Sequence, residues 1–141
     1  MPLDLSSLKK AVYSLERTVR VACSDTKMKS LDQDQQYAIR AGVIQNFEFT
    51  YELCWKFIQR WLKENLPQDS SDLPRTRKDF FRVAAQRKLI GDPLPWFEYG
   101  DARNLTSHTY SEDKAEIVFQ AAVHFVPEAK SLLRELERNN G

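Results

Sequence analysis

The stretch YAIRAGVIQNFEFTYELCWKFIQRWL, residues 37–62, decides the fold class. Its large apolar side chains recur every three or four positions, which is the spacing of residues that share one face of an α-helix. They form two adjacent rows: Tyr37, Ile44, Tyr51 and Ile58, and beside them Phe47, Cys54 and Trp61. Further apolar residues lie outside both rows: Val43, Leu53, Phe57 and Leu62. We therefore predict a helix of about 30 residues that ends before Pro67 and contacts neighbours on two sides.

The same periodicity continues outward from this helix, beyond a polar stretch at residues 24–36. It predicts further helices over residues 5–22, 76–90, 95–107 and 111–126, and a last apolar stripe over 129–136. We expect Gly91 to end the helix at 76–90, and Pro127 to break or restart the last helix. Residues 66–74 contain two prolines and are expected to form a loop. His124 stands among apolar neighbours in the sequence, so we expect it to be packed or partly buried.

Length and composition favour a single helical domain. The chain has 141 residues, which suits one domain spanning residues 1–141. It has 8 Phe, 5 Tyr and 3 Trp, enough large apolar side chains to build a core, whereas only 4 Gly and 6 Pro disfavour a turn-rich sandwich or barrel. Because the links between helices are short, we predict an all-α, up-and-down antiparallel bundle with four to five main helices.

Charge and residue usage exclude several function classes. The chain has 21 Lys and Arg against 20 Asp and Glu, and this near balance excludes wholesale polybasic binding to nucleic acid or lipid. No apolar run approaches the ~18 residues of a membrane span, so we expect a cytoplasmic protein without a membrane segment. Cys23, Cys54, His108 and His124 show no CxxC or HxxxH spacing, so we expect neither a metal site nor a cofactor.

The only plausible reactive set lies within residues 103–110, RNLTSHTY. Arg103 carries a permanent charge and a fork of donors that suits phosphate, and His108 can take and give a proton near neutral pH. Together they suit metal-independent cleavage of an RNA phosphodiester, with Asn104 orienting the imidazole or a phosphate oxygen. On an ideal helix, however, five residues put Arg103 and His108 roughly 140° apart. A bend, a helix end near Ser107 or a second subunit is therefore needed.

A structural interpretation of the same residues stays open. Arg103 then forms an ion pair on the surface, and His108 lies at a helix end near the negative end of the helix dipole. Spacing alone favours this second interpretation.

Two motifs resemble those of a known superfamily. Residues 103–110 resemble the RxxxxHxY motif of the HEPN superfamily, in which a polar residue after the arginine is typical. Residues 45–56, QNFEFTYELCWK, are similar to the FEFTxExxWK signature of its nucleotidyltransferase substrate-binding branch, which is related to the HepT toxins of HEPN/MNT toxin and antitoxin pairs. The two motifs stand in the order that the family shows.

The resemblance implies a helical homodimer whose two RxxxxHxY segments meet in one cleft. It implies a metal-independent ribonuclease in which Arg103 stabilises the phosphate and His108 acts as acid or base. Asn104 then positions the imidazole or the phosphate. It also implies a minimal nucleotidyltransferase as partner and antitoxin, which transfers AMP to Tyr110, a residue that otherwise contacts substrate. The alternative is a non-catalytic subunit that presents a substrate, or its own Tyr110, to that nucleotidyltransferase.

Two further groups of charged residues are candidates for function. A basic segment between residues 75 and 88 is either an RNA-binding face, a dock for an acidic partner or a solvated helix face. Its candidate RNA-binding residues are Arg75, Arg77, Lys78 and Arg82. Glu48 and Glu52 form a carboxylate pair one helical turn apart, although Glu52 and Lys56 have the spacing of an ordinary ion pair within a helix, and we expect that pair.

Overall fold

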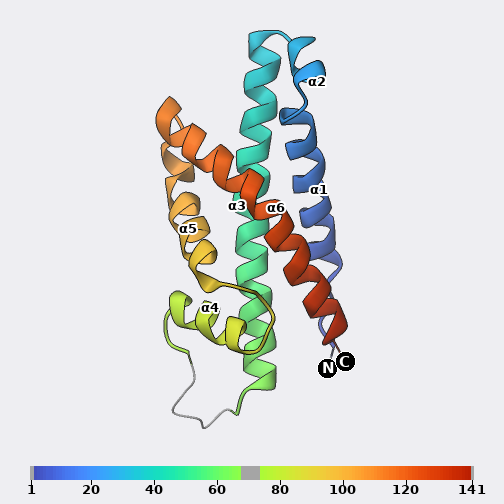
Figure 1. Ribbon diagram of the computed structural model, residues 1–141, viewed down its shortest axis with the longest axis vertical. Coiled ribbons are helices and arrows are strands. Elements are labelled where there is room, and N and C mark those ends of the chain that lie inside the picture. The colour runs from blue at the N-terminus through green and yellow to red at the C-terminus, as the bar shows by residue number, and fades with distance from the viewer. Residues whose placement is uncertain (1, 68–73, 141) are drawn as a thin grey trace.

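The computed structural model describes residues 2–67 and 74–140, and within these ranges the fold is all-α, as predicted. Figure 1 shows the arrangement of its helices. Their bounds are α1 (Ser6–Ala22), α2 (Asp25–Lys29), α3 (Gln33–Asn65), α4 (Arg77–Gln86), α5 (Pro93–Asn104), the 3₁₀ helix η1 (Leu105–His108) and α6 (Glu112–Arg138). Most of the loop predicted at residues 66–74 lies outside the described residues. None of the described helices is both long and apolar enough to cross a bilayer.

The long helix α3 is the axis of the bundle (Figure 1). The helix α1 runs antiparallel to it on one side, α5 lies on the other side, and α6 crosses it obliquely. The short helix α4 packs at the C-terminal end of α3. Because α3 contacts α1, α4, α5 and α6, the prediction that this helix has neighbours on two sides is confirmed.

The start of α3 and the segment before it were not fully predicted by the apolar periodicity. The helix begins at Gln33 because Asp32 and Gln35 form a capping box, in which each side chain accepts a hydrogen bond from the other residue's backbone N–H. The polar stretch before it contains α2, which is too short to show an apolar row and was not predicted. Tyr37, the first member of the predicted row, is 73% exposed, because the row enters the core only further along α3.

The core is centred on the ring of Phe125 in α6, which is fully buried. Ring centroids lie 5.4 Å away for Phe47 of α3, 5.3 Å for Trp96 of α5 and 5.0 Å for Tyr99 of α5. Two of these contacts are edge-to-face at nearly right angles, a favoured arrangement for aromatic pairs. Phe125 therefore joins three helices and fixes α5 against α3.

The helix α4 ends earlier than predicted, at Gln86 instead of near Gly91. The chain leaves the helix in a Schellman motif: Lys88 N–H donates to the Ala85 carbonyl, and Leu89 N–H donates to the Ala84 carbonyl. Lys88 takes the left-handed position of this motif, with a φ of 63°. Gly91 was the wrong choice because Leu89 is fully buried, so the chain must turn inward before the glycine.

The predicted break at Pro127 is also wrong, because α6 continues through this residue. Proline removes one backbone hydrogen bond and crowds the preceding turn, but the buried row of α6 holds both halves of the helix in the core. That row consists of Ala122, Phe125, Ala129 and Leu132. The Tyr99 hydroxyl donates to the carbonyl of His124, in the turn before the proline, at 3.2 Å. The imidazole of His124 is exposed, so its expected packing is wrong, because it falls on the face of α6 opposite to this row.

The two ends of the described chain lie side by side (Figure 1). The Leu3 N–H donates to the Asn140 side-chain oxygen at 2.7 Å, and the Asn140 amide nitrogen donates to the Leu3 carbonyl at 2.8 Å. This pair of hydrogen bonds ties the segment before α1 to the segment after α6.

A matched pair of leucine substitutions tests the core. Leu132→Ala removes a side chain that is fully buried between α6 and its neighbours, and we expect it to lower the free energy of unfolding by about 2–5 kcal/mol. Leu94→Ala changes a side chain that is 61% exposed on α5, and we expect a change within about 0.5 kcal/mol. Urea unfolding followed by far-UV circular dichroism measures both. Equal losses for the two variants would contradict the packing described here.

Candidate functional site

Arg103 lies in the last turn of α5, where two carboxylates of α3 hold its guanidinium. Its Nε donates to Glu52 Oε1 at 2.7 Å, and a terminal nitrogen lies 3.6 Å from Glu48 Oε1. Glu48 and Glu52 stand one turn apart on α3, so both face the same guanidinium. The Arg103 side chain is about one-third exposed, which leaves part of it open to solvent. The structure therefore places Arg103 in a cross-helix ion pair within a single chain.

Glu52 also forms an ion pair with a second arginine, which comes from another helix. A terminal nitrogen of Arg77, in the first turn of α4, lies 3.7 Å from the same Glu52 oxygen. Within the described part of the chain no ion pair joins Glu52 to Lys56, so the expected pair within α3 is wrong. Glu52 instead pairs with Arg77 of α4 and Arg103 of α5, whose side chains extend to it from the neighbouring helices.

The rest of the motif lies on the segment that links α5 to α6. The helix α5 ends at Asn104 and tightens into η1, which ends at His108. His108 and Tyr110 are both exposed, and their ring centroids are 6.0 Å apart with an interplanar angle of 72°. Asn104 is exposed as well. The structure thus brings His108 and Tyr110 together on a solvent-facing turn.

Arg103 and His108 do not meet within one chain. In the described residues no hydrogen bond or ion pair joins their side chains, since Arg103 turns to α3 while His108 lies beside Tyr110. The angular mismatch expected from the sequence therefore persists despite the helix ending at Asn104.

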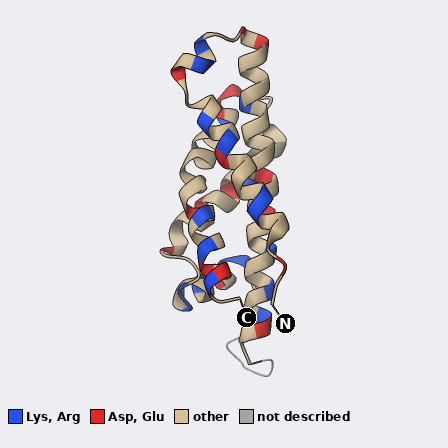
Figure 2. Cartoon of the chain, turned by 90° about the vertical axis from the view of Figure 1, so that its right-hand side faces the viewer, with Lys and Arg blue, Asp and Glu red and all other residues tan. Residues whose placement is uncertain are grey.

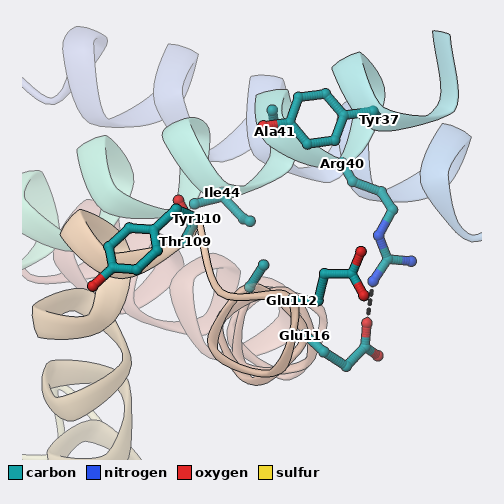
Figure 3. A pocket seen from close by; sticks show the side chains of 9 residues that line it. Tyr37, Arg40, Ala41, Ile44, Thr109, Tyr110, Glu112 and Glu116 are labelled. Atoms are coloured by element: carbon teal, nitrogen blue, oxygen red, sulfur yellow. Dashed lines mark hydrogen bonds and ion pairs between the residues drawn. The ribbon is translucent and has the colours of Figure 1, made fainter. Parts of the chain in front are cut away.

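A groove of about 450 Å³ runs beside Tyr110 (Figure 3). Tyr37 and Ile44 of α3 line one side, and Thr109 and Tyr110 line the other. Arg40 and Glu116 form an ion pair across it, and the Arg40 guanidinium lies 4.0 Å from the centroid of the Phe119 ring. Neither residue of this ion pair was singled out from the sequence, because no local pattern links α3 to the start of α6.

The basic segment covers aromatic rings instead of forming a purely solvated face. The Arg77 guanidinium lies 4.6 Å from the Trp55 ring centroid. The Lys78 and Arg82 cations lie 5.4 Å and 5.3 Å from the Phe97 ring centroid. Arg82 also pairs with Asp79 at 2.9 Å, whereas Arg75 is exposed. The cations of this segment therefore take part in ion pairs and cation–π contacts.

Opposite charges are interspersed on one side of the molecule (Figure 2). Figure 2 shows segments of Lys or Arg and of Asp or Glu alternating along the side that carries the two termini. No group of three or more His, Cys, Asp or Glu side chains in the described residues is arranged to hold a metal ion. Both cysteines are free thiols; Cys54 is buried and Cys23 exposed.

Comparison with known proteins assigns the family. The family described as nucleotidyltransferase substrate binding protein like matches residues 3–138. The chain belongs to this family. The match spans all the described helices, from α1 to α6.

Individual relatives support the assignment. The chain is 39% identical over 139 residues to a probable ribonuclease HepT from Haemophilus influenzae, with 98% of this chain and 94% of the relative covered. A solved structure from Haemophilus influenzae, described as the fold of a substrate binding domain of a nucleotidyltransferase, matches with a TM-score of 0.88 and 36% identity over 95% of this chain and 99% of that one. A Thermus thermophilus structure matches with a TM-score of 0.70 and 26% identity over 93% and 99%.

The coupling between Arg103 and Glu52 is measurable. A double-mutant cycle with Arg103→Gln and Glu52→Gln is expected to give a coupling energy of about 1–2 kcal/mol, because the pair is partly buried and directly hydrogen-bonded. The same cycle on Arg20 and Glu16, 3.6 Å apart with Arg20 67% exposed, is expected to give less than about 0.5 kcal/mol. Urea unfolding supplies the energies. A coupling at the first pair no larger than at the second would show that Glu52 does not hold Arg103.

Proposed function

We propose that this protein is a HepT-like, metal-independent endoribonuclease that acts as a homodimer. The observation that carries the proposal is the position of His108, which is exposed on the turn after α5, five residues after Arg103. The relative described as a probable ribonuclease supports the same activity.

The chemistry uses the RNA's own 2′-hydroxyl as nucleophile. His108 accepts the proton of the 2′-hydroxyl, and the 2′-oxygen attacks the adjacent phosphorus. The P–O5′ bond breaks, the 5′-oxygen takes a proton, and the products are a 2′,3′-cyclic phosphate and a 5′-hydroxyl. Arg103 balances the additional negative charge that develops on the phosphorane oxygens, and Asn104 orients the phosphate. No electron or co-reactant is required beyond the proton that His108 receives and returns.

The second subunit supplies what one chain lacks. Arg103 and His108 are not in contact within one chain, so a cleft formed by two RxxxxHxY segments is needed to direct both groups at one phosphate. The exposed rings of Tyr37 and Tyr110 beside the groove in Figure 3 are available for such an interface.

A minimal nucleotidyltransferase is the proposed partner and antitoxin. The family description names nucleotidyltransferases, and Tyr110 is 84% exposed, so its hydroxyl is accessible to a second protein. The Tyr110 oxygen attacks the α-phosphate of ATP, a Tyr–O–AMP bond forms and pyrophosphate leaves. The added phosphodiester places a negative charge beside His108, whose ring centroid is 6.0 Å from that of Tyr110, and this charge repels the RNA phosphate.

A non-catalytic substrate-binding subunit is the second candidate. One observation favours it: Glu48 and Glu52 already compensate the charge of Arg103, so the guanidinium must exchange a carboxylate for an RNA phosphate before it contributes to catalysis. In this alternative the same residues present a substrate, or Tyr110 itself, to the nucleotidyltransferase.

Cleavage of RNA in the presence of a chelator tests the activity. The native protein is expected to cleave single-stranded RNA with EDTA present, and His108→Ala and Arg103→Ala are each expected to reduce the rate at least about 100-fold. The matched control is His124→Ala, because His124 is also an exposed imidazole but lies away from the motif on α6. It is expected to cleave at the native rate.

The outcomes separate the two candidates. Cleavage that survives both motif substitutions comes from a contaminant or another site and contradicts the nuclease. No cleavage by any form, including the native protein, favours the non-catalytic subunit.

Modification of Tyr110 is tested with the partner nucleotidyltransferase and ATP. We expect a mass increase of one or more AMP units on the peptide that carries Tyr110, and none on Tyr110→Phe. Tyr37→Phe is the matched control, since Tyr37 is 73% exposed and lies across the same groove, and it is expected to be modified as the native chain is. An AMP label on any other peptide contradicts the assignment to Tyr110.

A further inference from the structure

A second, smaller pocket lies between α3, α4 and α5, away from the groove beside Tyr110. Its volume is about 170 Å³, below the range of pockets that hold a whole drug-sized ligand. Aromatic side chains form its inner part, and charged or polar side chains form its rim. The aromatic residues are Tyr51, Phe81, Trp96 and Phe97. The rim residues are Arg77, Lys78, Asp101 and Asn104.

Two polar groups on these aromatic side chains have no acceptor for their hydrogen. Tyr51 and Trp96 are both fully buried, and neither the Tyr51 O–H nor the Trp96 indole N–H donates a hydrogen bond. A buried donor without a partner costs roughly 1–3 kcal/mol, so native cores seldom retain one without a reason. Both residues line the same pocket.

Gly100 leaves room for the Tyr51 hydroxyl. A Cβ at position 100 would lie 2.9 Å from that hydroxyl, closer than a side-chain carbon tolerates. Glycine at this position of α5 therefore keeps the hydroxyl at the pocket. Burial raises the pKa of Tyr51, partly opposed by hydrogen bonding and positive charge from the Arg77 guanidinium, so the hydroxyl stays protonated and remains a donor at neutral pH.

The rim joins this pocket to the proposed reaction centre. Arg77 shares Glu52 with Arg103, and Asn104, which lines the pocket, is the residue after Arg103. Arg77 and Lys78 come from the first turn of α4 and bring two positive charges to one side. Asp101 lies on the α5 side and would repel a phosphate there, so a bound anion belongs next to α4.

We propose that this pocket binds one nucleotide of a single-stranded RNA, with its base among the aromatic side chains and its phosphate at Arg77 and Lys78. Because the two donors are covered in the free protein, the base displaces side chains of the rim as it enters. It then stacks on an aromatic ring, and the Tyr51 hydroxyl and Trp96 N–H donate to the acceptors of its edge. Asp101 accepts from its amino group. The proposal deepens the proposed function and rests on it, because it makes the pocket a recognition subsite beside the cleaved phosphodiester. A free mononucleotide offers the same chemistry, and the experiment separates the two sources.

A substitution that removes one oxygen atom tests the pocket. The full chain carrying His108→Ala, so that RNA stays intact, is titrated with fluorescein-labelled single-stranded RNA and followed by fluorescence anisotropy. Adding Tyr51→Phe removes only the unpaired hydroxyl, and we expect the RNA dissociation constant to rise roughly five- to tenfold. The melting temperature is expected to stay equal or to rise, because a buried unsatisfied donor is lost.

Tyr99→Phe is the matched control in the same background. Its hydroxyl is paired with the His124 carbonyl and does not line the pocket. We expect the melting temperature to fall and RNA binding to stay unchanged, the opposite pattern to Tyr51→Phe. A second pair compares Lys78→Ala with Arg87→Ala, which remove one charge each from the basic segment; only the first is at the pocket and is expected to weaken RNA binding several-fold.

The outcomes distinguish this proposal from the ribonuclease itself. RNA binding unaffected by both Tyr51→Phe and Lys78→Ala overturns the pocket, whatever the native protein cleaves. AMP or ATP binding that is weakened by Tyr51→Phe while RNA binding is not assigns the pocket to a free nucleotide and overturns the RNA subsite. If the native chain does not cleave RNA but Tyr51→Phe still weakens RNA binding, the ribonuclease fails and the RNA-binding pocket stands.

Discussion

The position of α5 depends on the packing of Phe125 between the rings of α3 and α5. Phe47 reaches it from one side, and Trp96 and Tyr99 reach it from the other, at centroid distances of 5.0–5.4 Å. Since α5 carries Arg103 in its last turn, this contact determines that the guanidinium arrives opposite Glu48 and Glu52. The aromatic core therefore positions the candidate site.

Local rules account for most helix positions. The row of Leu8, Val12, Leu15 and Val19 is buried as the three- and four-residue spacing requires, and Ser111 caps α6 by accepting from the Lys114 N–H. The errors arose where a local rule competed with the core. Gly91 and Pro127 are typical ends of helices, yet the buried side chains Leu89 and Phe125 decide the path of the chain at these points.

The sequence names candidate site residues but does not show their contacts. The motif identified Arg103, His108 and Tyr110, because these residues are close in sequence. The partner of Arg103 lies 51 positions away, and the spacing of Glu52 and Lys56 suggested a different pair. The pocket between α3, α4 and α5 was also not predictable, because it depends on a glycine and two unpaired donors that come from different helices. Neither the apolar periodicity nor a sequence motif shows which residues of different helices meet at this pocket.

The Schellman turn at Lys88 has a mechanical consequence for the two helices that it joins. Leu89 and Ile90 follow it directly and are anchored in the core, and Asp92 caps α5 two residues later by accepting from the Leu94 N–H at 3.0 Å. With so few free torsions between them, the link fixes the direction in which α5 leaves α4. A displacement of α4 is thus passed to the start of α5, the helix whose last turn carries Arg103.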